Sequence, residues 1–73
     1  MFIPIKTKEQ AKRFVVMTCK RQYGFAPDLK NIIIEHYNKK FIIFIAGGRK
    51  YIIKMYKDIP IATLINFTMP YDF

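Results

Sequence analysis

The stretch FIIFIAGGRKYIIKMYK, residues 41–57, constrains the fold of this chain more than any other feature. Two runs rich in β-branched and aromatic residues flank Gly47-Gly48, and glycine tolerates the positive φ angles that a two-residue hairpin turn requires. A membrane-spanning helix needs roughly 20 consecutive apolar residues, and Arg49 and Lys50 interrupt this stretch far earlier. The pattern therefore predicts a β-hairpin and no membrane segment.

A second turn is predicted at Asn38-Lys39, because asparagine readily adopts the left-handed conformation. The two turns together predict a three-stranded antiparallel meander with strands at residues 31–37, 40–46 and 49–56. Residues 58–69 fit two structures. Asp58 as an N-cap, Pro60 in the first turn and apolar residues at helical spacing favour a short helix, whereas the β-branched content favours a fourth strand. We expect the helix.

An N-terminal helix is predicted before the meander. Thr7 followed by Gln10 fits a capping box, and Gly24 with Pro27 beyond it fits a helix end. The residues that recur at the helical period on one side are Ala11, Phe14, Val15, Thr18, Cys19 and Gln22. We therefore expect a single α+β domain spanning residues 1–73, with this helix packed on the three-stranded meander and a short C-terminal helix or fourth strand after it.

Neither face of the predicted sheet is polar, so we expect both faces to be covered. The helix is expected to cover the first face, which carries Ile32, Ile34, Ile43, Ile45 and Ile52. The second face carries Tyr37, Lys40, Phe44, Arg49, Tyr51 and Met55. The C-terminal segment, a second copy in a homodimer, or a different partner could cover this second face.

The formal net charge of +8 favours an anionic partner, which is DNA, RNA or an acidic protein surface. Aromatic rings interleaved with Lys and Arg are typical of single-stranded nucleic-acid binding. The leading hypothesis is a small non-enzymatic accessory protein, of the kind that phages encode, that binds nucleic acid or associates with a nucleoprotein. The residues expected to contact nucleic acid are Lys12, Arg13, Lys20, Arg21, Lys40, Arg49 and Tyr51.

The alternative hypothesis is a protein-binding inhibitor or regulator of a host enzyme that acts through an exposed sheet face. Its expected interface consists of Tyr37, Phe44, Tyr51 and Met55. We expect no cofactor and no membrane partner. Because the N-terminal sequence turns polar too early for a secretory signal, we expect a cytoplasmic protein.

The sequence does not predict an enzyme. Glu35 and His36 are neighbours, but alternation along a strand should point them to opposite faces. Cys19 falls on the apolar side of the helix, where a thiol usually behaves as a small hydrophobic group. One cysteine and one histidine are too few for a structural zinc site. We therefore expect neither a catalytic group nor a metal.

Overall fold

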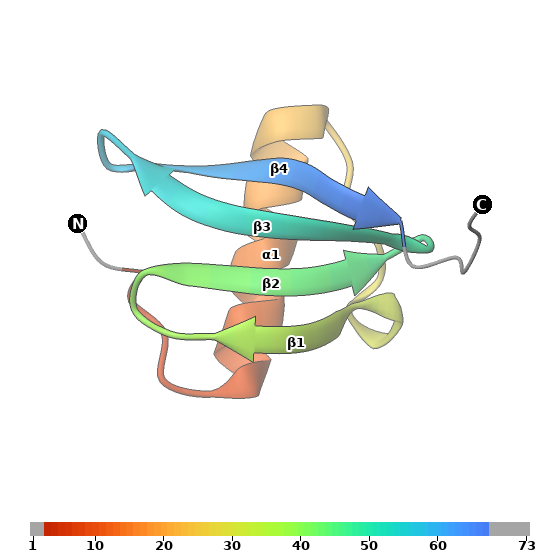
Figure 1. The fold of residues 1–73 in the computed structure, drawn as a ribbon, viewed down its shortest axis with the longest axis horizontal. Helices are drawn as coiled ribbons and strands as arrows, with labels where there is room; N and C mark the ends of the chain where they lie inside the picture. Colours follow the sequence, from red (N-terminus) through yellow and green to blue (C-terminus); the bar gives the residue numbers. More distant parts are fainter. Residues whose placement is uncertain (1–2, 68–73) are drawn as a thin grey trace.

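A computed structural model describes residues 3–67, which form one helix packed on one face of a four-stranded antiparallel sheet (Figure 1). The helix α1 spans Lys8–Tyr23, and a short 3-10 turn follows at Leu29–Asn31. The strands are β1 (Ile33–Tyr37), β2 (Phe41–Ala46), β3 (Arg49–Tyr56) and β4 (Ile59–Phe67), and they are neighbours in chain order. The expected α+β class is confirmed.

The two ends of α1 form as the sequence predicts. The Thr7 hydroxyl accepts a hydrogen bond from the Gln10 backbone N–H at 3.1 Å, and the Gln10 side chain accepts one from the Lys6 N–H at 2.6 Å. The Thr7 contact satisfies a donor that the first helical turn leaves unpaired, and the Gln10 contact pairs the N–H of the residue before the N-cap. At the other end Gly24 adopts a φ of 87°, which is a left-handed conformation that favours glycine.

Two tight turns connect the last three strands. Gly47 and Gly48 have φ angles of 61° and 75°, which confirms the predicted hairpin. Lys57 and Asp58 also have positive φ angles, 50° and 70°, and they join β3 to β4. The expectation of a helix after residue 58 is therefore wrong. Residues 59–67 pair with β3 instead, and β4 lies at the edge of the sheet. Proline has no backbone N–H to donate, so an edge strand such as β4 can accommodate Pro60.

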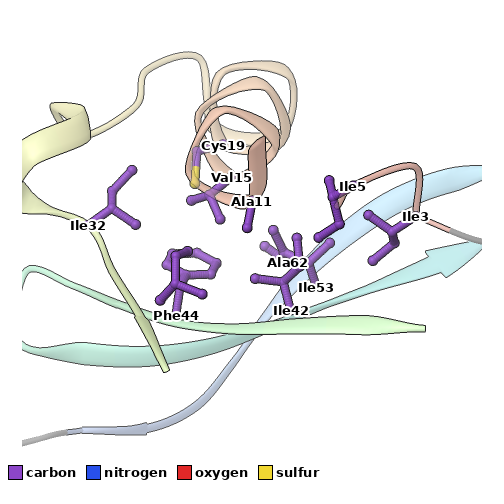
Figure 2. Close-up of a cluster of buried hydrophobic side chains, with 11 residues drawn as sticks. Ile3, Ile5, Ala11, Val15, Cys19, Ile32, Ile42, Phe44, Ile53 and Ala62 are labelled. Carbon is purple, nitrogen blue, oxygen red and sulfur yellow. The ribbon is translucent and has the colours of Figure 1, made fainter. Parts of the chain in front are cut away.

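The helix covers the opposite sheet face from the one that we expected. Ile42, Phe44 and Ile53 point toward α1 and are at most 1% exposed (Figure 2), whereas Ile43 and Ile52 lie on the uncovered face. The cause is a β-bulge between Ile34 and His36. Because an extra residue in one strand reverses the alternation beyond it, Ile34 joins the Phe44 face instead of the Ile43 face.

The core lies between α1 and this inner face of the sheet (Figure 2). Ala11, Val15 and Cys19 recur at every fourth position of α1 and are all buried. They form the stripe that the helical period predicts. The buried core residues that come from outside α1 are Ile3, Ile5, Ile32, Ile34, Ile42, Phe44, Ile53 and Ala62.

Gln22 closes the edge of the sheet at β4. Its amide nitrogen donates to the Ala62 carbonyl and its amide oxygen accepts from the Ala62 N–H, both at 2.8 Å. The side chain therefore pairs with Ala62 as the peptide group of a fifth strand would. Arg21 also donates to the Pro60 carbonyl. Unpaired edges invite strand addition from other chains, and these contacts occupy edge groups of Pro60 and Ala62 within the chain itself.

Removing the Gln22 amide should destabilise the protein measurably. Gln22→Ala leaves the Ala62 N–H without its side-chain partner and leaves the Ala62 C=O with only the Tyr23 hydroxyl, at 3.4 Å. We expect a loss of about 1–3 kcal/mol in the free energy of unfolding. Gln10→Ala is the matched control, because it removes the same amide from an exposed position and should cost less than about 1 kcal/mol. Urea unfolding of both variants measures the difference. Equal losses would contradict the role assigned to Gln22.

Candidate nucleic-acid interface

No described part of the chain covers the sheet face that points away from α1. Figure 1 looks onto this face, with the helix behind the sheet. The strand register places side chains in rows across this face. One row contains His36, Ile43, Ile52 and Thr63, and the next contains Phe41, Lys54 and Ile61. We call this surface the open face. The uncovered face of an antiparallel sheet usually carries polar side chains. The open face is instead rich in isoleucine and aromatic rings, which makes it a candidate binding surface.

Aromatic and basic residues gather at one end of the sheet. The β1–β2 and β3–β4 turns both lie at that end (Figure 1). The strands bring His36, Phe41, Lys54 and Tyr56 there. The turns add Lys39, Lys40 and Lys57, all of which are exposed. We call these seven residues the aromatic–lysine end.

The rings at this end are held by local contacts. His36 and Phe41 stack with their centroids 5.3 Å apart and their planes at 26°. The Asn38 side-chain oxygen accepts hydrogen bonds from the N–H groups of Lys40 and Phe41, at 2.7 and 3.0 Å, and so fixes the start of β2. Tyr56 is 69% exposed. One ring pair and one exposed ring therefore stand on the same surface as Lys54.

The other end of the open face is aliphatic. Ile33 pairs with Ile45, and Ile33 is 59% exposed. Lys50 reaches across the sheet to the Glu35 carboxylate at 2.9 Å, which neutralises the charge of this lysine locally. This ion pair also shows that Glu35 lies on the open face together with His36. Our expectation that the two side chains point to opposite faces is wrong, because the bulge in β1 interrupts the alternation.

The residues expected to bind nucleic acid are divided between the two layers of the fold. Lys12, Arg13, Lys20 and Arg21 lie on α1, behind the sheet, and Arg13 is 3.5 Å from the Glu9 carboxylate. Lys40 lies at the aromatic–lysine end. Arg49 begins β3 at the opposite end of the sheet. The structure therefore does not gather these cations into one patch.

The residues expected to form a protein interface pack on the helix side of the sheet. Phe44 is 1% exposed and stacks on Tyr51, with centroids 5.0 Å apart and planes at 13°. Tyr37 and Met55 are partly buried against the same core. Sequence reasoning missed His36, Phe41, Lys54 and Tyr56. The alternation of lysines in β3 was the available signal, because Lys50 and Lys54 share a face that a helix cannot cover without burying charge.

Burial shifts the pKa of two titratable side chains outside the open face. Burial raises the pKa of the Cys19 thiol, so the nucleophilic thiolate is rarer at neutral pH than for an exposed cysteine. Burial also raises the pKa of Tyr23, with smaller contributions from Tyr51 and Cys19.

Within residues 3–67, no three His, Cys, Asp or Glu side chains come together in a way that could hold a metal ion. The same range contains no helix that is both long and apolar enough to cross a membrane.

Comparison of the chain with protein-family models, curated proteins and solved structures finds no significant match. Any function must therefore be inferred from the arrangement of side chains on this fold.

Proposed function

We propose that this protein is a non-enzymatic accessory protein that binds single-stranded nucleic acid on the open face of its sheet. The observation that carries the proposal is the aromatic–lysine end, where exposed rings and lysines share one surface. Bases stack on aromatic rings, and each such contact contributes about 1–3 kcal/mol without requiring a particular sequence. Phosphates require cations beside the rings, and Lys54 stands next to Phe41 in the strand register.

The aliphatic part of the open face extends this surface. Ile43 and Ile52 adjoin the aromatic rows and are only half-buried, so sugars and base edges can pack on them. The net charge of +8 raises the local concentration of an anionic strand before any contact forms. A protein of this kind would act in the cytoplasm, where single strands are exposed during replication, transcription and translation.

The two layers of the fold provide a direct test by salt dependence. Lys40→Ala with Lys54→Ala removes two cations from the aromatic–lysine end. Arg13→Ala with Lys20→Ala removes two exposed cations from α1, so it is matched in charge. The slope of log affinity against log salt should flatten by about 0.7 for each lost phosphate contact with a single strand. We expect the slope to flatten by roughly 1.4 for the Lys40/Lys54 double variant and to stay almost unchanged for the Arg13/Lys20 double variant.

Fluorescence anisotropy with a labelled oligothymidine or oligouridine of about 15 nucleotides measures these slopes. Circular dichroism of each double variant, recorded first, confirms that the fold is intact. Equal slopes for the two double variants would contradict binding on the open face, because the field of the whole molecule would then be the only contribution. A steeper loss for the helix pair would place the strand on α1 instead.

A protein partner is the second candidate, and the aliphatic end of the open face favours it. Ile33, Ile45 and Ile52 form an apolar surface beside the neutralised Lys50–Glu35 pair. Such a surface is typical of the centre of a protein interface, where the surrounding lysines would attract an acidic rim. Ile33→Ser distinguishes a protein partner from nucleic acid, because Ile33 lies far from the aromatic–lysine end. It should leave oligonucleotide affinity unchanged if the strand binds at the rings.

A further inference from the structure

The loop that follows α1 separates two hollows on the helix side of the sheet. Phe25, Ala26 and Pro27 line both hollows, so these three residues form a ridge between them. Phe25 is 72% exposed and so protrudes from the ridge. In Figure 1 the loop passes behind the sheet, away from the open face. The ridge is therefore separate from the surface that we propose for nucleic acid.

One of the hollows lies between α1 and the ridge, and its volume is about 550 Å³. We call it the helix-end hollow. Val16 and Lys20 line it from α1, where a spacing of four residues puts them on the same side of the helix. Leu29, which is 37% exposed, lines it from the start of the 3-10 turn. The apolar part of this lining gains free energy when another apolar group removes it from water.

The helix-end hollow carries one charge of each sign. Lys20 and Asp28 both line it, and both are exposed. Among residues 3–67 neither side chain makes an ion pair, and Asp28 makes no capping hydrogen bond to the 3-10 turn. The lining is therefore neutral overall, in a chain whose formal net charge is +8. A second copy of this chain would meet less repulsion here than over a surface that carries the net positive charge.

We propose that two copies of this chain associate about a two-fold axis at the helix-end hollow. A two-fold interface repeats every contact, because each copy presents the same surface. The ridge of each copy enters the hollow of the other, so that Phe25 packs between Val16 and Leu29 of the second copy. The same rotation brings Lys20 of each copy opposite Asp28 of the other. The exposed ring leaves water, and each exposed charge gains an opposite partner.

The size of this surface predicts a weak dimer. Eight residues line the helix-end hollow, whereas a standard interface contains about 20–30 residues on each side. We therefore expect a dissociation constant on the order of 100 μM. Both open faces stay exposed in the dimer, because the hollow lies on the helix side of the fold. The association therefore does not depend on the function proposed above.

Sedimentation equilibrium of the intact chain from about 10 μM to about 1 mM measures the association. The weight-average mass should rise from 8.7 kDa toward twice that value and no further, because a two-fold interface is closed. Phe25→Ala should raise the dissociation constant roughly tenfold or more, since it removes the apolar anchor. Tyr56→Ala is the matched control, because it removes a ring of similar exposure from the open face and should change nothing.

A charge exchange tests the two ion pairs. Asp28→Lys and Lys20→Glu should each weaken the dimer roughly fivefold to tenfold, because each places like charges opposite each other. The double variant restores both pairs with reversed signs, so its dissociation constant should return to within about twofold of the parent value. Lys20→Glu also lowers the net charge of each copy by two. If this variant associated more strongly than the parent, general repulsion alone would govern association, and the proposed pairs would be overturned.

Three other results would overturn the proposal. The first is a mass of 8.7 kDa at about 1 mM protein, and the second is growth beyond two copies. Amide NMR shifts on dilution should appear at Val16, Phe25 and Leu29, and shifts centred on Ile43 and Ile52 would place the contact on the open face instead. Association is measured without nucleic acid, and Phe25→Ala keeps the whole open face for oligonucleotide titrations. This proposal and the proposed function can therefore fail independently.

Discussion

Phe44→Ala should remove a large share of the protein's stability. Phe44 is 1% exposed and packs beneath α1 at the centre of the core (Figure 2). Truncating a buried phenylalanine costs about 3–5 kcal/mol, through lost burial and the cavity left behind. A domain of 73 residues has a total stability of roughly 4–11 kcal/mol. The substitution therefore removes between about a quarter and all of the stability.

Urea unfolding followed by circular dichroism measures this loss. Phe25→Ala is the matched control, because it truncates the same side chain at a position that is 72% exposed. We expect the control to change the free energy of unfolding by less than about 0.5 kcal/mol. If the Phe44 variant unfolded at the same urea concentration as the control, the inner face would not be the core.

The second large effect concerns two neighbours on β2. Ile42 is 0% exposed and faces α1, whereas Ile43 lies on the open face. Ile42→Ala should cost about 2–5 kcal/mol, and Ile43→Ala about 1 kcal/mol or less, because only the first opens a cavity in the core. At about 4–8 °C per kcal/mol for a domain of this size, the thermal midpoints of the two variants should differ by several degrees.

Identical side chains on adjacent positions of one strand make this pair a clean comparison. Both variants lose the same three carbon atoms and the same β propensity. Calorimetry of the two proteins side by side gives the result directly. If Ile43→Ala were the more destabilising change, the helix would cover the face that sequence reasoning first assigned to it.

The elements that could be predicted from the sequence depend on a few local residues. Thr7, Gln10 and Gly24 define the helix ends, and Gly47-Gly48 define one hairpin, because each acts on backbone groups within four residues. The Lys57-Asp58 turn is different. Neither residue is a strong signal for positive φ, and the apolar residues after it fit a helix as well as an edge strand. Pairing with β3 decides between helix and strand, and a short stretch of sequence gives no information about that pairing.

The bulge in β1 explains why the helix was expected on the other face of the sheet. Alternation sorted the residues of β2 and β3 correctly into two faces, but it placed Ile32 and Ile34 with Ile43. That error made the Ile43 face seem the more apolar one. A bulge depends on pairing along the whole ladder, and nothing in residues 33–37 marks it locally. The aromatic residues singled out from the sequence, Tyr37, Phe44 and Tyr51, lie on the helix side of the sheet, and the rings of the open face were not singled out.

The most direct test of binding on the open face is an amide NMR titration of the intact protein with oligothymidine at about 50 mM salt. We predict chemical shift changes at Phe41, Lys54 and Tyr56, with α1 residues such as Arg13 unchanged. Tyr56→Ala should weaken binding by about 1–3 kcal/mol if a base stacks on that ring. Shifts confined to α1 would contradict the assigned surface. The absence of binding to both oligothymidine and oligouridine at this salt concentration would contradict the proposed function itself.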